Sequence, residues 1–392
     1  MNRTINKIIK IDLYIIVSIC AFLTFYCQAY RGYDTDIGLH VMRIIPVVHG
    51  DYYIPHSMLH YITYGIYKIC NWISLNISLY DVMVLLETFL VALILYTIYR
   101  VLLYYLKDKF NEIILLLISI SLIFVTSIYI PFFNKFMYLG QGSPNTWHNP
   151  TTFIIKPIAI LCFWGLVTYI QKYQHLSNKK LPIILSILFA LSVWAKPSFA
   201  ITFYPALLIF LIIYYRKNFK IYWNIFLILL PSIILLAIQY YHTYSQSLAS
   251  TNDMKDNIIF TFFGVIRLWT KVPFISLLLA IAFPLSILVI DLKNVKKNQI
   301  LILSWLNVII AYLEFAFLAE KYKFPQGAFG FGYNLALFLL FIFSFIHLLN
   351  YIKSNTQKKQ QIYAAICLII YSLHLYSGVL YYLRYFITKT YT

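Results

Sequence analysis

The chain has 392 residues, of which 61% are hydrophobic and 11% are charged, and its mean hydropathy is +0.77. This composition excludes a soluble globular domain and predicts a polytopic helical membrane protein. The net charge of +18 comes from basic residues scattered between apolar segments, which favours cytoplasmic loops beside anionic headgroups and argues against nucleic acid binding.

Eleven segments are long enough and apolar enough to be predicted as membrane spans. We therefore expect an all-α bundle of about eleven spans that forms a single domain over residues 1–392. Basic residues precede the first apolar segment, as in a signal peptide, but no clear cleavage site follows, so we expect this segment to remain as a span. The expected spans are approximately 11–30, 80–106, 112–131, 151–171, 181–196, 199–215, 221–240, 272–291, 299–318, 333–350 and 361–380.

Lysine and arginine are concentrated in alternate connections between these segments. With the N-terminus inside, six inner segments hold three basic residues each, which makes 18 of the 31 Lys and Arg residues. The positive-inside rule then predicts a cytoplasmic N-terminus and an outer C-terminus. We expect a multi-pass protein of a bacterial plasma membrane. A further span at 58–78 would place the basic clusters outside, so we expect an interfacial helix there.

The longest polar interruption near the start of the chain is 31–60, which belongs to a first outer loop at 31–79. We expect a helix from Ile37 that lies along the membrane surface and turns its ionisable groups away from lipid. Pro46 should bend or end this helix. The ionisable face is predicted to carry Asp36, His40 and Arg43, and the apolar stripe to consist of Ile37, Val41, Ile44 and Val48.

Two carboxylates in this loop are the candidates for catalysis. Asp34 or Asp36 could act as a general base that takes the proton of an acceptor hydroxyl. The Asp-x-Asp pair could alternatively hold a divalent cation on a diphosphate, or it could be two solvated carboxylates. Together with His40 and Arg43, His56 and His60 are predicted to contact substrate. No compact ligand set points to zinc, and the five cysteines are too far apart for a metal or disulfide framework.

A second outer loop at 132–150 is rich in turn formers and in polar side chains. Trp147 could form an aromatic platform for a sugar, and Asn145, His148 and Asn149 could supply directional hydrogen bonds. The alternative is that the loop is a rigid cap.

Cationic side chains at the outer ends of the spans are candidates for binding a lipid phosphate. Lys156 and Lys196 lie at the edges of apolar segments, where snorkelling is the alternative explanation. Arg267 is a further candidate in the outer segment 241–271. Glu320 precedes a run of glycines and aromatic residues at 327–332 that could cover a substrate, or could simply connect two helices.

The first loop resembles the GT-C class of integral-membrane glycosyltransferases. The resemblance covers about the first hundred residues and consists of an acidic pair after a span, a surface helix, a glycine turn and a segment with proline and aromatic residues. It departs from the common pattern in having one proline where two are usual and in lacking a large soluble C-terminal domain. The matching residues are Asp34-Thr35-Asp36, the helix to Val48, Gly50, and Ile54-Pro55-His56-Ser57-Met58-Leu59-His60-Tyr61.

The resemblance implies a glycosyltransferase that moves a sugar from a polyprenyl-phosphate donor to an extracytoplasmic glycan or lipid, with an Asp of the first outer loop as base. We prefer Asp36, because it begins the helix and shares a face with His40 and Arg43. No cofactor is expected, apart from a divalent cation if Asp34 and Asp36 act together. The alternatives are a polysaccharide polymerase or ligase on lipid-diphosphate-linked glycans, and a transporter of lipid-linked oligosaccharides.

Overall fold

The computed structural model describes residues 2–173, 180–244, 257–355 and 357–390. Within these residues the chain is an α-helical bundle, and its one sheet is a ribbon of two three-residue antiparallel strands, so the predicted all-α class is confirmed. The last two residues, for which an outer location is predicted, lie outside the described residues. The elements are α1 (Asn2–Tyr30), α2 (Ile37–His49), α3 (Met58–Trp72), α4 (Leu79–Leu106), α5 (Glu112–Phe124), α6 (Thr151–Lys172), α7 (Lys180–Ala195), α8 (Ser198–Tyr215), α9 (Phe219–Tyr244), β1 (Ile258–Phe260), α10 (Gly264–Trp269), α11 (Pro273–Ile290), α12 (Leu292–Val295), α13 (Gln299–Phe317), β2 (Leu318–Glu320), η2 (Phe324–Gln326), α14 (Gly330–Ser354) and α15 (Lys358–Thr388).

Nine helices among the described residues are long and apolar enough to cross a membrane, and they coincide with nine of the eleven predicted spans. The other two predicted spans form shorter helices, α5 with 13 residues and α7 with 16. At 1.5 Å per residue α5 is about 20 Å long, whereas a hydrocarbon core is about 30 Å thick. The predicted segment 112–131 is therefore wrong beyond Phe124, where the chain leaves the helix. The segment 58–78 forms α3, which is not among the nine.

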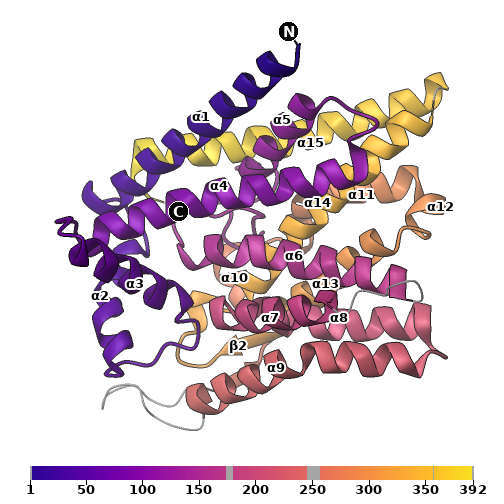
Figure 1. Cartoon of the computed structure of the whole chain (residues 1–392). Coiled ribbons are helices and arrows are strands. Elements are labelled where there is room, and N and C mark those ends of the chain that lie inside the picture. Colours follow the sequence, from indigo (N-terminus) through magenta and orange to yellow (C-terminus); the bar gives the residue numbers. More distant parts are fainter. Residues whose placement is uncertain (1, 174–179, 245–256, 356, 391–392) are drawn as a thin grey trace.

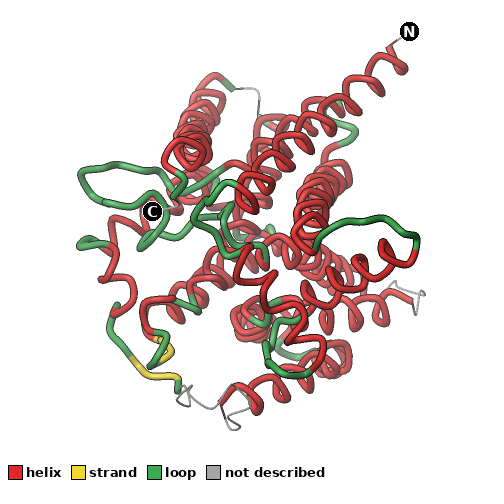
Figure 2. The backbone as a smooth tube through the Cα atoms, turned by 90° about the vertical axis from the view of Figure 1, so that its left-hand side faces the viewer, coloured by secondary structure: helices red, strands yellow, loops and turns green. Residues whose placement is uncertain are grey.

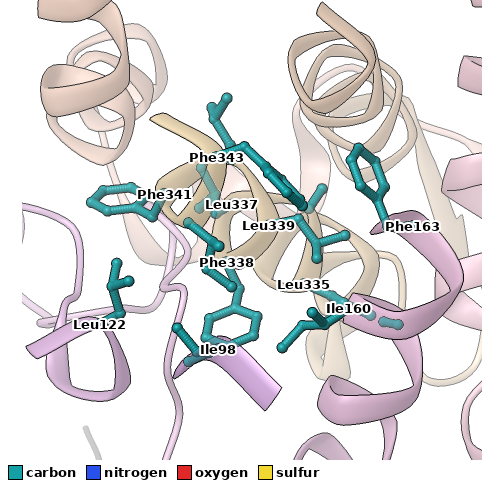
Figure 3. Packing of buried hydrophobic residues seen from close by; sticks show 14 of the residues in the cluster. Ile98, Leu122, Ile160, Phe163, Leu335, Leu337, Phe338, Leu339, Phe341 and Phe343 are labelled. Carbon is teal, nitrogen blue, oxygen red and sulfur yellow. The ribbon is translucent and has the colours of Figure 1, made fainter. Parts of the chain in front are cut away.

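Helix α14 is the centre of the bundle. Almost all of its side chains from Gly332 to Leu349 are buried, as expected for a helix that is apolar on every side. It packs against α4, α6, α8, α11, α13 and α15. Figure 3 shows side chains of α14, including Phe338 and Phe343, directed to different sides of the helix among residues of α4, α5 and α6. The ring of Phe343 stacks on Phe163 of α6 with centroids 5.1 Å apart.

The outer helices expose large apolar side chains to their surroundings. The exposed fraction is 56% for Ile16 of α1, 52% for Ile234 of α9 and 63% for Ile369 of α15. Such an extensive apolar exterior is unfavourable in water and suits the hydrocarbon region of a bilayer. Length, composition and exterior thus agree on a multi-pass membrane protein.

The segments predicted as outer loops gather at one end of the bundle. Figure 1 shows α2 and α3 at the left-hand end and α12 at the opposite end. Figure 2 looks onto the end that carries α2 and α3, and shows loops crossing over the ends of the helices. Residues far apart in the sequence meet at this end. For example, the Asp34 N–H donates a hydrogen bond to the Lys389 carbonyl at 2.8 Å.

The connection between α5 and α6 is the main departure from the predicted loops. Residues 141–150 are all buried, so this segment is part of the interior and not a cap on the outer surface. Irregular backbone is tolerated at such depth only where protein groups satisfy its polar atoms. The Ser127 hydroxyl donates to the Gly142 carbonyl at 2.7 Å, and the Ser143 N–H donates to Asn334 Oδ1 at 2.9 Å.

Candidate functional site

Asp36 lies directly before α2, where the sequence predicts the helix to begin. Its carbonyl accepts the His40 N–H at 2.9 Å, but its side chain does not cap the helix. The carboxylate instead accepts a hydrogen bond from the Asn149 side-chain amide at 2.8 Å. The Asp36 N–H donates to the His148 carbonyl at 3.1 Å. The segment that precedes α6 therefore fixes both the backbone and the side chain of Asp36.

Helix α2 ends within one residue of the predicted Val48 but differs from the prediction in the surroundings of its apolar stripe. It continues for three residues beyond Pro46 and ends at His49, where Gly50 adopts a φ of +85° that suits glycine. The predicted stripe does not face lipid, because α3 and α4 cover it, and His40 is buried as well. The buried apolar residues of the stripe are Ile37, Val41 and Ile44, while the exposed apolar residues of the helix are Leu39, Met42 and Ile45.

A chain of hydrogen bonds connects Asp36 with Lys196. The Asn149 amide group donates to the Asp36 carboxylate, and its carbonyl oxygen accepts from the Thr151 hydroxyl at 2.7 Å. The same hydroxyl oxygen accepts from the Lys196 ammonium at 2.6 Å. A carboxylate and an ammonium are thus held in fixed relation by two neutral side chains, without a direct ion pair between them.

Burial changes the pKa values of both charged groups in this chain. Burial raises the pKa of Asp36, while Lys196 and the hydrogen bond from Asn149 oppose this rise. Arg43 also lowers the pKa of Asp36, as expected of a cation on the same helix face, but burial has the larger effect. Burial lowers the pKa of Lys196 to about 7, against the opposing effect of Asp36. The pKa of each group is therefore closer to neutral pH than it is in water, which favours proton transfer in acid–base catalysis.

Three histidines form a neutral polar cluster beside the hydrogen-bonded residues that connect Asp36 with Lys196. His40 Nδ1 lies 3.2 Å from His60 Nε2, and the ring of His56 lies 6.4 Å from that of His40. Burial lowers the pKa of His40 to about 3 and that of His60 to about 4, and it lowers the pKa of His56 well below its usual value. These rings carry no charge at neutral pH, and His56 is the one of the three that is partly exposed. The described residues contain no group of three or more His, Cys, Asp or Glu residues that could hold a metal ion.

Asp34 and Arg43 lie at the edge of this site. The side chain of Asp34 is exposed, and the Tyr385 hydroxyl donates to its backbone carbonyl at 2.8 Å. The guanidinium of Arg43 lies 5.1 Å from the centre of the Tyr52 ring. Asp36, with its half-buried carboxylate and defined partners, is therefore the better placed of the two acids for catalysis.

A second buried lysine lies beyond Lys196. Lys156 of α6 is 4% exposed, donates to Asn145 Oδ1 at 2.7 Å, and lies 4.5 Å from the centre of the Phe338 ring. The Lys196 ammonium lies 3.7 Å from the centre of the Phe331 ring. A cavity of about 10 Å³, enough for about one water molecule, separates the two lysines and is also lined by Thr146, Thr152, Ser198 and Asn334.

The polar loop before α6 has a different role from the predicted one. Trp147 is 3% exposed and packs against Phe124 and Tyr382, so it cannot serve as a platform for a sugar. Asn145 is also buried, and its amide donates to the carbonyls of the last turn of α5 and of the residue that follows. His148 lies between two tyrosines, and burial lowers its pKa to about 3. These residues hold the loop in place and do not face a substrate.

Two further candidates lie on other elements. Arg267 is exposed on α10, with its guanidinium 5.5 Å from the centre of the Phe262 ring. Glu320 ends β2 and accepts from the Tyr244 hydroxyl at 3.0 Å. No hydrogen bond or ion pair within the described part of the chain joins Arg267 to Asp36 or Lys196. Of the three cations predicted to bind phosphate, only Lys196 is connected to the candidate base by hydrogen bonds.

Of the residues that connect the site, Asn149 is predicted from the sequence only as a candidate for sugar binding, and neither Thr151 nor Ser198 is predicted. Asn149 and Thr151 follow a turn-rich stretch and precede an apolar helix, so their pattern indicates a helix start and gives no sign of Asp36 as a partner. Phe331 stands in the glycine and aromatic run, whose role as a cover was left open. Ser198 has no distinguishing pattern at all.

Neither a protein-family model nor a curated protein matches this sequence. The arrangement offers a carboxylate with a raised pKa, an ammonium that is bridged to it, a neutral polar wall of histidines and a second ammonium across a cavity. Such a site can remove a proton at one point and stabilise developing negative charge at another.

Proposed function

We propose that the chain is a membrane glycosyltransferase that moves a sugar from a polyprenyl-phosphate donor to a hydroxyl of a glycan or lipid acceptor. The observation that supports this best is the hydrogen-bonded chain from Asp36 through Asn149 and Thr151 to Lys196. Sugar transfer from a phosphate needs a base for the acceptor hydroxyl and a cation for the leaving phosphate. The hydrogen bonds hold such a base, the Asp36 carboxylate, at a fixed position relative to such a cation, the Lys196 ammonium.

In the proposed reaction the Asp36 carboxylate takes the proton of the acceptor hydroxyl. The acceptor oxygen forms a bond to the anomeric carbon while the bond from that carbon to the phosphate oxygen breaks. The phosphate leaves with the bonding electrons, and the Lys196 ammonium stabilises its added negative charge. The raised pKa of Asp36 favours proton transfer near neutral pH more than an ordinary carboxylate does.

The surroundings of the site fit a lipid-borne donor. The apolar exterior suits a bilayer, and the site lies at the end of the bundle that carries α2 and α3, where α3 contacts α7 (Figure 1). A polyprenyl chain could remain in the membrane while its phosphate reaches Lys196. The partly exposed neutral ring of His56 offers a hydrogen bond to a sugar hydroxyl without competing as a cation for the phosphate, while the buried His40 and His60 lie behind it.

The test is transfer by the purified full chain in liposomes that contain one of a panel of polyprenyl-phosphate sugars and a lipid extract as acceptor. We expect transfer of radiolabelled sugar from at least one donor, with dependence on Asp36. The exposed Asp51, which lies in the turn after α2, provides the control variant Asp51→Asn, which should retain activity. Absence of transfer from every donor, or equal activity of Asp36→Asn and Asp51→Asn, would contradict the proposal.

A further inference from the structure

The small cavity between Lys156 and Lys196 contains an unusual concentration of positive charge. The two lysines are 4% and 6% exposed, and neither forms a salt bridge within the part of the chain that the structure describes. Their partners are the neutral oxygens of Asn145 and Thr151 and the faces of aromatic rings. A buried ammonium without an anion costs several kcal/mol of folding free energy. Two of them around one cavity indicate that an anion binds between them.

Three long helices begin at this cavity and add to its positive potential. Helix α6 begins at Thr151, α8 at Ser198 and α14 at Gly330, and residues from the first turn of each line the cavity. The N-terminus of a helix carries about half a positive charge, although the first N–H groups of α6 and α14 already donate to carbonyls of the preceding turns. The hydroxyl of Ser198 is buried and has no hydrogen-bond partner among the described residues. It is therefore available to a ligand.

The close approach of α8 and α14 depends on Gly332. A Cβ atom at this position would lie 2.5 Å from Thr202 Cγ2 and 3.1 Å from the Ser198 carbonyl oxygen. Any larger residue would push the first turns of the two helices apart. The glycine thus allows both N-termini to border the same small space.

We infer that this cavity is the binding site of a single phosphate group, held by Lys156, Lys196 and Ser198. A doubly charged tetrahedral anion matches two ammonium groups and several hydroxyl and N–H donors, whereas a singly charged anion would leave one cation unpaired. The cavity now admits about one water molecule, so binding requires the lysine side chains and Phe331 to move apart. The assignment of this phosphate to the polyprenyl phosphate that leaves the sugar rests on the proposed function, since the phosphate of the donor is a diester with one negative charge and acquires its second charge only as it leaves.

The first experiment uses inorganic phosphate and does not require catalysis. The thermal unfolding temperature of the full chain in detergent is measured at about pH 6.5 while phosphate replaces chloride at constant ionic strength. We expect phosphate to raise Tm by about 3 °C or more, and we expect Lys156→Met and Ser198→Ala to reduce this rise. Lys172→Met changes an exposed lysine at the other end of the same helix and should preserve it.

The outcomes separate this inference from the proposed function. An equal rise in Lys156→Met, Ser198→Ala and Lys172→Met would show only a general salt effect and would overturn the phosphate site. Ser198→Ala keeps the test decisive if Lys156→Met does not fold. A short-chain polyprenyl phosphate should produce the same Lys156-dependent rise at lower concentration. A response to inorganic phosphate alone would overturn the assignment to a lipid. Phosphate binding without sugar transfer would contradict the proposed function and leave the site intact.

Discussion

The side-chain amide of Asn149 donates a 2.8 Å hydrogen bond to the carboxylate of Asp36, although 113 residues separate them. Because an amide N–H can only donate, this bond favours the ionised form of Asp36 and opposes the effect of burial. The other end of the same amide leads through Thr151 to Lys196. One side chain thus couples the candidate base to the candidate cation.

The first prediction distinguishes the two acids of the first loop. Asp36→Asn should lower the rate of sugar transfer by about 10² to 10⁴, the usual effect of removing a general base, while donor binding is retained. Asp34→Asn should lower it much less, because the Asp34 side chain is exposed. Initial rates and donor binding of both variants decide the matter. An inactive Asp34→Asn beside a nearly normal Asp36→Asn would reverse the assignment, and loss of activity with EDTA would favour shared metal ligation.

The second prediction concerns Asn149 itself. Asn149→Ala removes the bond that favours ionised Asp36, so the pKa of Asp36 should rise further and the acid limb of the pH profile should move to higher pH. The rate at neutral pH should fall by about tenfold, since a hydrogen bond to a charged group contributes about 1.5 kcal/mol. The profile of kcat/KM against pH is the measurement. Asn76→Ala, in an exposed loop, is the control, and an unmoved acid limb in Asn149→Ala would contradict the coupling.

The helices could be predicted from the sequence because apolar segments separated by polar connections are a local signal. Helix α2 begins at Ile37 as predicted, and the spacing of Asp36 and His40 brings both to the site. The sequence could not show that α3 and α4 cover the apolar stripe of α2, because coverage depends on tertiary packing. For the same reason the amphipathic pattern of α2 predicts a helix on a membrane surface, whereas in the structure its apolar stripe packs against α3 and α4.

The loop before α6 could not be interpreted correctly from its composition. Polar residues such as Asn145 usually indicate an exposed loop, but here the partners of Asn145 lie 20 and 23 residues earlier in the chain and at Lys156. Trp147 likewise suggested a sugar platform, whereas the structure surrounds it with other aromatic rings. Burial of a polar loop is decided by distant hydrogen-bond partners, and a sequence pattern does not reveal these.

The third prediction concerns stability in acid. The buried His148 has a pKa of about 3 in the folded chain, whereas an unfolded histidine has a pKa near 6.5. Between these values the unfolded state binds more protons, so stability falls as pH decreases from 6.5, by about 1.4 kcal/mol per pH unit for this group. Tm measured from pH 7.5 to pH 5 should fall, and His148→Gln should fall less steeply than the wild type. The exposed His49 provides the control His49→Gln, for which an equally reduced slope would count against this explanation.

The fourth prediction concerns the packing of α15 against the buried connection. A Cβ atom at Gly378 would collide with the Phe124 carbonyl oxygen and lie 3.1 Å from the Thr126 nitrogen. Gly378→Ala should therefore destabilise the fold by about 3 kcal/mol or more, because backbone cannot move aside as a side chain can. Gly65→Ala, where nothing lies within 4 Å, should be neutral or stabilise α3 by up to about 1 kcal/mol. Unfolding temperatures in detergent compare the two, and similar values would show that α15 does not pack as described.

The last prediction concerns the protonation of Lys196. Its ammonium must be charged to stabilise the leaving phosphate, and burial lowers its pKa to about 7. In the free enzyme, kcat/KM should therefore fall about tenfold per pH unit above pH 7, whereas kcat should fall only at higher pH, because a bound phosphate raises the pKa of the ammonium.

Lys196→Arg tests this explanation of the alkaline limb directly. An arginine stays protonated in proteins, so this variant should lose the alkaline limb of kcat/KM even if its larger side chain lowers the rate throughout. Lys196→Met should be slow at every pH and should show no alkaline limb either. The acid limb, which reports Asp36, should remain in Lys196→Arg, because the substituted guanidinium still supplies a positive charge beside that carboxylate. An unchanged alkaline limb near pH 7 in Lys196→Arg would assign the titration to another group and remove Lys196 from the proposed mechanism.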